Sequence, residues 1–514
     1  MNGPLPRRAG VGALAAAVPL IFGGCAAGPT FHRPAPPAAA AYTGAPLPPQ
    51  TASASVPGGD AQRFLSGHDV AFEWWREFGS AALDARVRQA LRANPSVAAA
   101  QAALRSAQEL VYAQRGYFYP TVGVGYTFER QQIEGNVATT QAPGVQGNGQ
   151  NLVPSAPAQP LIYNFHTAQL TVGYTPDVFG GNRRRLESLE AQSEVQHFEL
   201  EATYVTLASN VVAASIEEGA TRAQLAASQE IVTLSERALA VTDTKYARGY
   251  ASRLEVVAAQ AQLDAARALL PPLERQLAQT LDLLRALLGR LPDADLGAPL
   301  ELEALHLPRE LPLSLPAQLI EQRPDVRAAE EQMRSANAEV GVATAAMLPQ
   351  FTIDAAAGGA ADEFGWMFRD GGPFWSLIAG VTQPLFAGGT LLHTRRAAEQ
   401  ALRQAAGQYQ ETVLAAYQNV ADTLSALLAD ARALESAAGA EQAARSTLEL
   451  TREQQRDGFA DPLAELAAQI DERQAMLALV QAQAVRFGDT AALYQALGGG
   501  WWNRAAAAPS ARAD

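Results

Sequence analysis

The side chains that most often bind metals or perform catalysis are few and dispersed in this sequence. No two of its six histidines are four residues apart, the spacing that places two ligands on one helix face. The histidines stand at positions 32, 68, 166, 197, 306 and 393. The five methionines do not cluster, which weakens an interpretation as a copper exporter without excluding it. We therefore predict no catalytic residue, no metal site, no cofactor and no enzyme activity.

Two glycine pairs, Gly180-Gly181 and Gly388-Gly389, resemble parts of phosphate-binding loops. Neither pair is followed by the Lys-Ser or Lys-Thr dipeptide that such a loop requires. Both pairs follow segments that we interpret below as strands. We predict that they form corners between a strand and a helix, where glycine readily adopts the positive φ that is needed.

The only cysteine is a candidate for covalent lipidation. Cys25 follows two glycines, an apolar run over Val11–Phe22 and two arginines, an order typical of an export signal. Small residues directly before a cysteine resemble the lipobox of bacterial lipoproteins, in which that cysteine is acylated and becomes the first residue. We expect residues 1–24 to be a signal peptide and Cys25 to carry the only covalent group; an ordinary secretory signal is the alternative. Ala26, where aspartate would favour inner-membrane retention, favours the outer membrane.

The overall charge argues against a nucleic-acid partner. The formal net charge is −13, and removal of the signal, which holds two basic residues and no acidic one, makes it −15. Outside the signal, no stretch reaches the roughly 18 apolar residues of a membrane-spanning helix. If the mature chain contacts a bilayer, we expect it to do so through β-strands or through its lipid.

The sequence contains one architectural unit twice. With an offset of 229, residues 95–120 align without a gap on 324–349, and nine of these 26 positions are identical. With an offset of 208, Pro176–Gly181 aligns on Pro384–Gly389; with an offset of 209, Gly249 aligns on Gly458. We predict two internal repeats, 61–316 and 317–514, preceded by an Ala/Pro-rich tether over 25–60.

Each repeat is expected to contain a β-hairpin. Apolar residues alternate with Thr, Gly and Glu over 121–129, and a second alternating run covers 170–175. Two strands of about 9–11 residues joined by a polar loop are typical of an outer-membrane hairpin. We place the hairpins at 120–176 and 349–384; the second has strands near 351–355 and 375–381 and a shorter loop.

Long helices are expected after each hairpin. Residues 182–248 contain no proline and one glycine, and 390–457 are similar. A helix of this length spans about 100 Å. Shorter helical runs follow the two turn glycines and complete helical hairpins over 182–288 and 390–497. Helices over 81–119 and 317–348 precede the strands, and an irregular, proline-containing belt over 289–316 links the repeats.

The four strands cannot close a membrane barrel alone, since the smallest natural barrels have eight. Two copies would supply eight strands, whose interior side chains fill, whereas three would supply twelve and leave a lumen. We expect an α+β membrane protein that forms a trimer. Trp74-Trp75 and Trp501-Trp502 are expected to pack in the belt.

Several segments together resemble the TolC/OprM-type outer-membrane efflux proteins, in the NodT-like lipoprotein branch that serves resistance-nodulation-division pumps. These segments are Cys25–Pro29, Trp74–Gly79, Asp177–Gly181, Gln383–Gly389, Tyr246–Ser252 and Ala496–Trp501. The resemblance covers nearly the whole mature chain. It implies a homotrimer with a twelve-stranded transmembrane β-barrel, continuous with a periplasmic twelve-helix α-barrel. It also implies a periplasmic adaptor protein and an inner-membrane pump as partners.

The resemblance also implies a function for the turns between the long helices. It assigns adaptor docking at the periplasmic tip to Gly249, Ala251, Ser252 and Gly458. Relatives often carry an aspartate of the periplasmic constriction nine residues after the turn glycine, but this sequence has Ala258 and Ala467 there. We therefore expect a charged aperture to use other residues. The candidates are Arg456, Asp457 and Asp461, or Glu465.

The expected function is a passive exit duct for drugs or other small molecules at the outer membrane. Two alternatives keep this fold and change the cargo: type I protein secretion and metal-ion efflux. A periplasm-spanning structural coiled coil is the alternative from another class. The four alternating segments argue against it, because an all-helical scaffold has no use for them.

Overall fold

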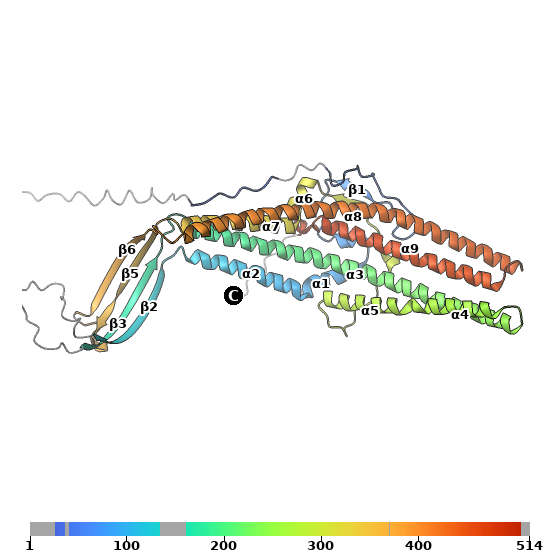
Figure 1. The fold of residues 1–514 in the computed structure, drawn as a ribbon, viewed down its shortest axis with the longest axis horizontal. Helices are drawn as coiled ribbons and strands as arrows, with labels where there is room; N and C mark the ends of the chain where they lie inside the picture. The colour runs from blue at the N-terminus through green and yellow to red at the C-terminus, as the bar shows by residue number, and fades with distance from the viewer. Residues whose placement is uncertain (1–25, 36–40, 134–160, 370, 505–514) are drawn as a thin grey trace, which may run out of the picture. The chain divides into compact units, whose positions relative to one another are not determined.

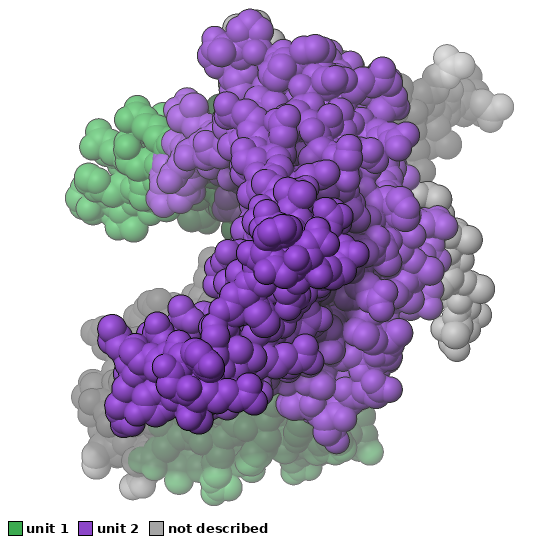
Figure 2. Space-filling view, turned by 90° about the vertical axis from the view of Figure 1, so that its right-hand side faces the viewer, with its two compact units in different colours: residues 1–31, 108–190, 334–403 green, residues 32–107, 191–333, 404–514 purple. Residues whose placement is uncertain are grey.

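The computed structural model describes residues 26–35, 41–133, 161–369 and 371–504. Cys25 and the predicted signal peptide therefore lie outside the described residues. The chain divides into two compact units, coloured separately in Figure 2. We call them the sheet unit, residues 1–31, 108–190 and 334–403, and the hairpin unit, residues 32–107, 191–333 and 404–514. Each unit contains segments of both sequence repeats.

The sheet unit contains a four-stranded antiparallel sheet with the order β2-β3-β5-β6 (Figure 1). Its strands are β2 (Thr121–Ile133), β3 (Leu161–Tyr174), β5 (Gln350–Ala361) and β6 (Pro373–Thr382). The register pairs Thr121 with Gly173, Val172 with Ala355 and Gln350 with Thr382. All four predicted strands are confirmed. Three are longer than expected, with 13, 14 and 12 residues.

One face of the sheet is apolar and exposed within the single chain. Val122 and Val124 alternate along β2 with Thr121 and Gly123, and the two valines are 66% and 84% exposed. On β6, Trp375 is 80% exposed. Because side chains alternate between the two faces of a strand, this pattern gives the sheet one apolar face along its length.

The helices are of two kinds, very long and short (Figure 1). The very long ones are α3 (Gly181–Ala247) and α8 (Thr390–Arg456), of 67 residues each. The others are α1 (Ala81–Ala93), α2 (Pro95–Gly116), α4 (Arg253–Ala268), α5 (Leu270–Leu287), α6 (Pro316–Gln322), α7 (Pro324–Ala345) and α9 (Pro462–Ala496). Within the described residues, none of these helices has the length and apolar character needed to cross a membrane.

Three predicted helical runs are each divided in two, and the predictions of single helices were wrong there. The divisions lie at Asn94, Leu269 and Arg323. Asn94 and Arg323 are extended, with ψ of 126° and 122°, because a following proline disfavours helical backbone at the preceding residue. At Leu269 the backbone stays helical, but the prolines at 271 and 272 remove two amide donors and a new helix begins.

The core of the hairpin unit is built around aromatic side chains. Trp74 and Trp75 are almost fully buried in the 3-10 helix η1 (Trp74–Phe78), and the Trp74 ring stacks on Tyr494 of α9 with a centroid distance of 5.0 Å. The packing predicted for this tryptophan pair is confirmed.

Smaller elements complete the fold. They are the parallel strands β1 (Arg63–Ser66) and β4 (Glu310–Leu313), and the 3-10 helices η2 (Leu302–Ala304), η3 (Phe364–Trp366) and η4 (Trp501–Asn503).

The segment predicted to be an extended tether has no helix or strand where it is described, and it contacts the rest of the chain. In the sheet unit, Ala27 donates its amide to the Phe179 carbonyl oxygen at 2.9 Å. In the hairpin unit, the fully buried guanidinium of Arg486 donates to the Asp60 carbonyl oxygen at 2.6 Å and to the Thr51 hydroxyl at 3.1 Å. Parts of the predicted tether are thus held against the rest of the chain, because buried donors bind its polar groups.

Candidate functional site

The turns that end α3 and α8 have the same construction. Gly249 and Gly458 have φ of 78° and 82°, in the left-handed region that favours glycine. The next amide, of Tyr250 or Phe459, donates back across the turn at 2.8 Å in each case. This arrangement is a Schellman motif, which satisfies carbonyl groups at the end of a helix. The expected turn function of the two glycines is confirmed.

The helices that follow the turns begin with matching side-chain caps. The Ser252 hydroxyl accepts from the Glu255 amide, and the Glu255 carboxylate accepts from the Ser252 amide. In the second turn, the Asp461 carboxylate accepts from the Leu463 amide at 3.0 Å. These caps accept hydrogen bonds from backbone amides that the first turn of a helix leaves unsatisfied. Both turns therefore have a defined conformation.

An ion pair joins the two helical hairpins next to these turns. Lys245, in the last turn of α3, contacts the Asp461 carboxylate at the start of α9. The Leu463 amide, followed by Lys245, lowers the pKa of Asp461 below its ordinary value. The Asp461 carboxylate therefore caps its own helix and binds the other hairpin at the same time.

A groove of about 390 Å³ lies beside this ion pair, between the first hairpin and α9. Small and apolar side chains line most of it, including Ala251, Ala258, Leu463 and Ala467. The two alanines at the positions where relatives often carry aspartate thus line one groove. Tyr250 also lines the groove, and both Tyr250 and Phe459 are exposed at the turns themselves.

The three expected aperture residues are not brought together within the chain. Asp461 binds Lys245, whereas Arg456 lies 3.9 Å from Glu453 of its own helix. Asp457 is exposed, and its carboxylate has no hydrogen bond or ion pair to any described residue. Their predicted contact was between chains, and it stays a prediction. The fourth candidate, Glu465, pairs with Arg452 at 3.1 Å within the second hairpin.

Lys245 was not among the residues predicted from the sequence to form the site. A signal was available, since Lys245 is the only lysine among 39 basic residues, and all the others are arginine. Its partner, Asp461, is 216 positions away, so the contact itself could not be found without the tertiary structure.

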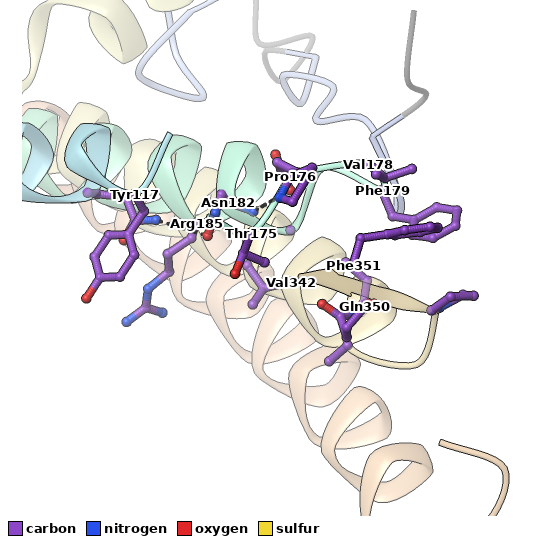
Figure 3. Close-up of a pocket in the computed structure, with 16 residues that line it drawn as sticks. Tyr117, Thr175, Pro176, Val178, Phe179, Asn182, Arg185, Val342, Gln350 and Phe351 are labelled. Carbon is purple, nitrogen blue, oxygen red and sulfur yellow. Dashed lines mark hydrogen bonds between the residues drawn. The ribbon is translucent and has the colours of Figure 1, made fainter. Parts of the chain in front are cut away.

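A second cavity, of about 370 Å³, lies within the sheet unit at the corner between β3 and α3 (Figure 3). Asp177 caps α3 by accepting from the amides of Asn182 and Arg183 at 2.9 and 3.0 Å. Phe179 packs beside Phe351 of β5, with ring centroids 6.4 Å apart. These contacts fit the predicted structural role of the first glycine pair, because Gly180 has a φ of 76°.

The described residues contain no group of three histidine, cysteine, aspartate or glutamate side chains arranged to hold a metal ion. The exposed apolar sheet face and the two matching helical turns instead suit a channel subunit. One solved structure has a similar fold: the alignment with the CmeC outer membrane channel of Campylobacter jejuni covers 93% of this chain and 95% of that one, with a TM-score of 0.77 and 18% identity.

The chain belongs to the outer membrane efflux protein family, whose sequence profile matches residues 87–290 and 315–499. This membership confirms the predicted family. Among curated proteins, the chain is similar to the probable efflux pump outer membrane protein TtgC of Pseudomonas putida KT2440, at 28% identity over 94% of each chain. It is also similar to the pyoverdine export outer membrane protein OpmQ of the same strain, at 28% identity over 83% of this chain and 88% of that protein.

Proposed function

We propose that this chain forms the passive outer-membrane exit duct of a tripartite efflux pump, driven by an inner-membrane partner. The observation that carries the proposal is the four-stranded sheet, in which the outer edges of β2 and β6 have no pairing partner among the described residues. In lipid, each unpaired backbone group costs several kcal/mol. The sheet therefore needs other copies at both edges.

Three copies satisfy this need and leave a path for solutes. Together they close twelve strands around a lumen, whereas the interior of an eight-stranded barrel is filled by side chains. Native mass spectrometry of the detergent-solubilised protein should show a trimer. A stable monomer with its full β content would contradict this assembly.

The transport function is tested in cells that lack their own exit duct. We expect the full chain, produced with the adaptor and pump of its own organism, to restore resistance to small toxic molecules. The names of two similar proteins mention toluene and pyoverdine, which supports small molecules as cargo. Export of a secreted protein without restored resistance would favour type I secretion instead.

The hairpin turns are the proposed docking site for the periplasmic adaptor. Gly249, Ala251, Ser252 and Gly458 lie at or beside the two turns, and the exposed Tyr250 and Phe459 offer apolar surface. A photo-crosslinking amino acid in place of Tyr250 should capture the adaptor, whereas the same change at exposed Leu291 in the linker between α5 and η2 should not. Equal capture at both positions would contradict docking at the turns.

The Lys245–Asp461 pair is the proposed latch of the resting tip. It joins the two hairpins of one chain, and an exposed pair of this kind contributes only about 0.2–1 kcal/mol. A contact of that size can be broken when an adaptor docks without unfolding the helices. Contacts of Arg456, Asp457 and Asp461 between chains remain part of the proposal for the closed aperture.

Cys25 is the proposed lipid attachment site and anchors the chain in the outer membrane. The proposal rests on the small residues before Cys25 and on the absence of any other cysteine in the sequence. Mass spectrometry of the mature N-terminus should show an acylated Cys25. An unmodified thiol, or cleavage at another position, would overturn this assignment.

A further inference from the structure

The two corners between strand and helix are repeated in sequence but differ in their surroundings. In the first corner, Pro176–Gly181, the side chains are half-buried against the second repeat. Phe179 packs on Phe351, and a Cβ placed on Gly181 would lie 3.3 Å from the Cβ of Ala345. The end of α7 and the start of β5 thus cover the first corner within the chain.

The second corner, Pro384–Gly389, is not covered. Leu385 and Phe386 are 92% and 91% exposed, and Phe386 makes no ring contact with any described residue. The repeat alignment places Leu385 where the first corner has Asp177, which caps α3. The second corner has therefore exchanged a helix-capping carboxylate for apolar surface that nothing in its own chain buries.

The internal repeat identifies the surface that fits this corner. Subtracting the offset of 229 from Ala345 and Phe351, which cover the first corner, gives Gly116 and Val122. The segment 116–122 is exposed in the single chain, with Tyr117 at 65% and Val122 at 66%. The chain has no third repeat to place there, so a second copy is the only source of an equivalent surface.

We propose that Leu385 and Phe386 of one copy pack against residues 116–122 of the next copy, in a head-to-tail contact that closes a ring. The inference rests on the proposed trimer and specifies one of its contacts. The two segments adjoin the unpaired strand edges, because β6 ends at Thr382 and β2 begins at Thr121. Pairing of these edges between copies would bring the corner and the segment together, as a heterologous interface requires.

Lipid is the competing partner for the second corner, where it would bury Leu385 and Phe386. It explains their apolar character but not the correspondence with the covered first corner. We therefore favour a second copy of the chain as the partner of this corner. Contact with lipid is the alternative that the experiments distinguish.

Disulfide crosslinking in outer-membrane vesicles tests the contact in the full chain. Phe386→Cys combined with Val122→Cys should give covalent dimers and trimers on oxidation, since a disulfide forms only when the two Cβ atoms lie about 3.5–4.5 Å apart. Phe179→Cys combined with Phe351→Cys is the matched control, and it should form a bond within one chain and no covalent oligomer. Each single variant should remain monomeric on the denaturing gel.

A second measurement does not depend on disulfide geometry. Phe386→Ser should lower the temperature at which the trimer dissociates, whereas Phe368→Ser, at a residue of the same unit that is 67% exposed, should not. An intact trimer with no crosslink and no shift in that temperature would overturn the contact. Stronger quenching by brominated lipids in a Phe386→Trp variant than in the unaltered chain, whose Trp375 already lies on the apolar face, would then assign the corner to the bilayer. Absence of any trimer in the unaltered chain would instead refute the proposed assembly itself.

Discussion

The contact between Lys245 and Asp461 is the smallest feature on which the proposed function depends. It joins two helical hairpins through one pair of side chains that are 33% and 45% exposed. Water screens a pair at this exposure, so its contribution to folding is small. Because the ion pair lies beside both turns, breaking it should change the distance between the turns, although the pair contributes little to the free energy of unfolding.

We expect Lys245→Met and Asp461→Asn each to raise single-channel conductance in planar bilayers, because either change breaks the ion pair that joins the hairpins beside their turns. Trimer stability should stay unchanged. Arg267→Met is the matched control, since it removes an ion pair of 2.7 Å to Glu236 inside the first hairpin. Equal conductance in all variants would place the closure of the tip elsewhere, for example at exposed Phe459.

A second residue-scale feature is an acidic pair between α8 and α9. Burial, a hydrogen bond to Asp489 and the charge of Asp489 raise the pKa of Asp430 to about 7, although nearby Arg486 opposes the shift. A carboxyl group whose pKa is raised in the folded state stabilises that state at low pH. It loses this contribution as the pH rises through about 7.

Thermal unfolding of the intact protein should therefore occur at lower temperature at pH 8 than at pH 6. Asp430→Asn should reduce this difference, because the amide cannot lose a proton. Asp422→Asn, at an exposed position of the same helix, serves as the control and should follow the unaltered protein. A slope for Asp430→Asn parallel to that of the unaltered protein would contradict the assignment.

At the scale of elements, glycine is favourable at the two turns and unfavourable inside the long helices. Gly249 and Gly458 have positive φ, which costs an L-residue about 1–2 kcal/mol. Gly407 lies inside α8, is exposed and has open space where a Cβ would be. In a helix interior, alanine is favoured over glycine by about 0.8–1.0 kcal/mol.

We expect Gly249→Ala and Gly458→Ala to lower the midpoint of thermal unfolding, and Gly407→Ala to raise it. Circular dichroism at 222 nm is the measurement. The three variants carry the same chemical change, so only backbone conformation separates them. A decrease for Gly407→Ala as large as that for the turn variants would show that the added methyl group itself is harmful.

Much of this element structure could be predicted from the sequence. Alternation over 121–129 identified a strand, and the turn glycines at 249 and 458 identified the ends of helical hairpins. The divisions at Asn94 and Arg323 were missed although the prolines that cause them are visible. A proline is tolerated at the start of a helix, so its presence alone does not decide whether one helix continues or a second begins.

The functional site could be predicted from the sequence less completely than the fold. The turns repeat a local pattern and could be located, but the partner of Asp461 depends on how two hairpins lie side by side. The contacts of the predicted tether also depend on the tertiary structure, because Arg486 donates to backbone carbonyl groups more than 400 positions away in the sequence. Contacts of that range leave no periodic trace in a single sequence.

At the scale of the whole molecule, the apolar sheet face should determine insertion into the membrane. Val124→Arg places a charge on the apolar face of β2, where a mid-membrane arginine costs about 2–4 kcal/mol. Thr127→Arg places the same charge on the opposite face. We expect Val124→Arg to reduce the amount of trimer in outer membranes, and Thr127→Arg to leave it unchanged but shift ion selectivity. Equal losses would contradict the assigned faces.

The single lysine gives the molecule an unusual chemical property. An amine-specific dye that does not react with guanidinium groups would find one side-chain target per chain, at the end of α3. Because Asp461 holds that amine, the labelling rate should increase whenever the two hairpins separate. The natural sequence thus provides a built-in reporter that could follow separation of the two hairpins in the purified protein, without any introduced residue.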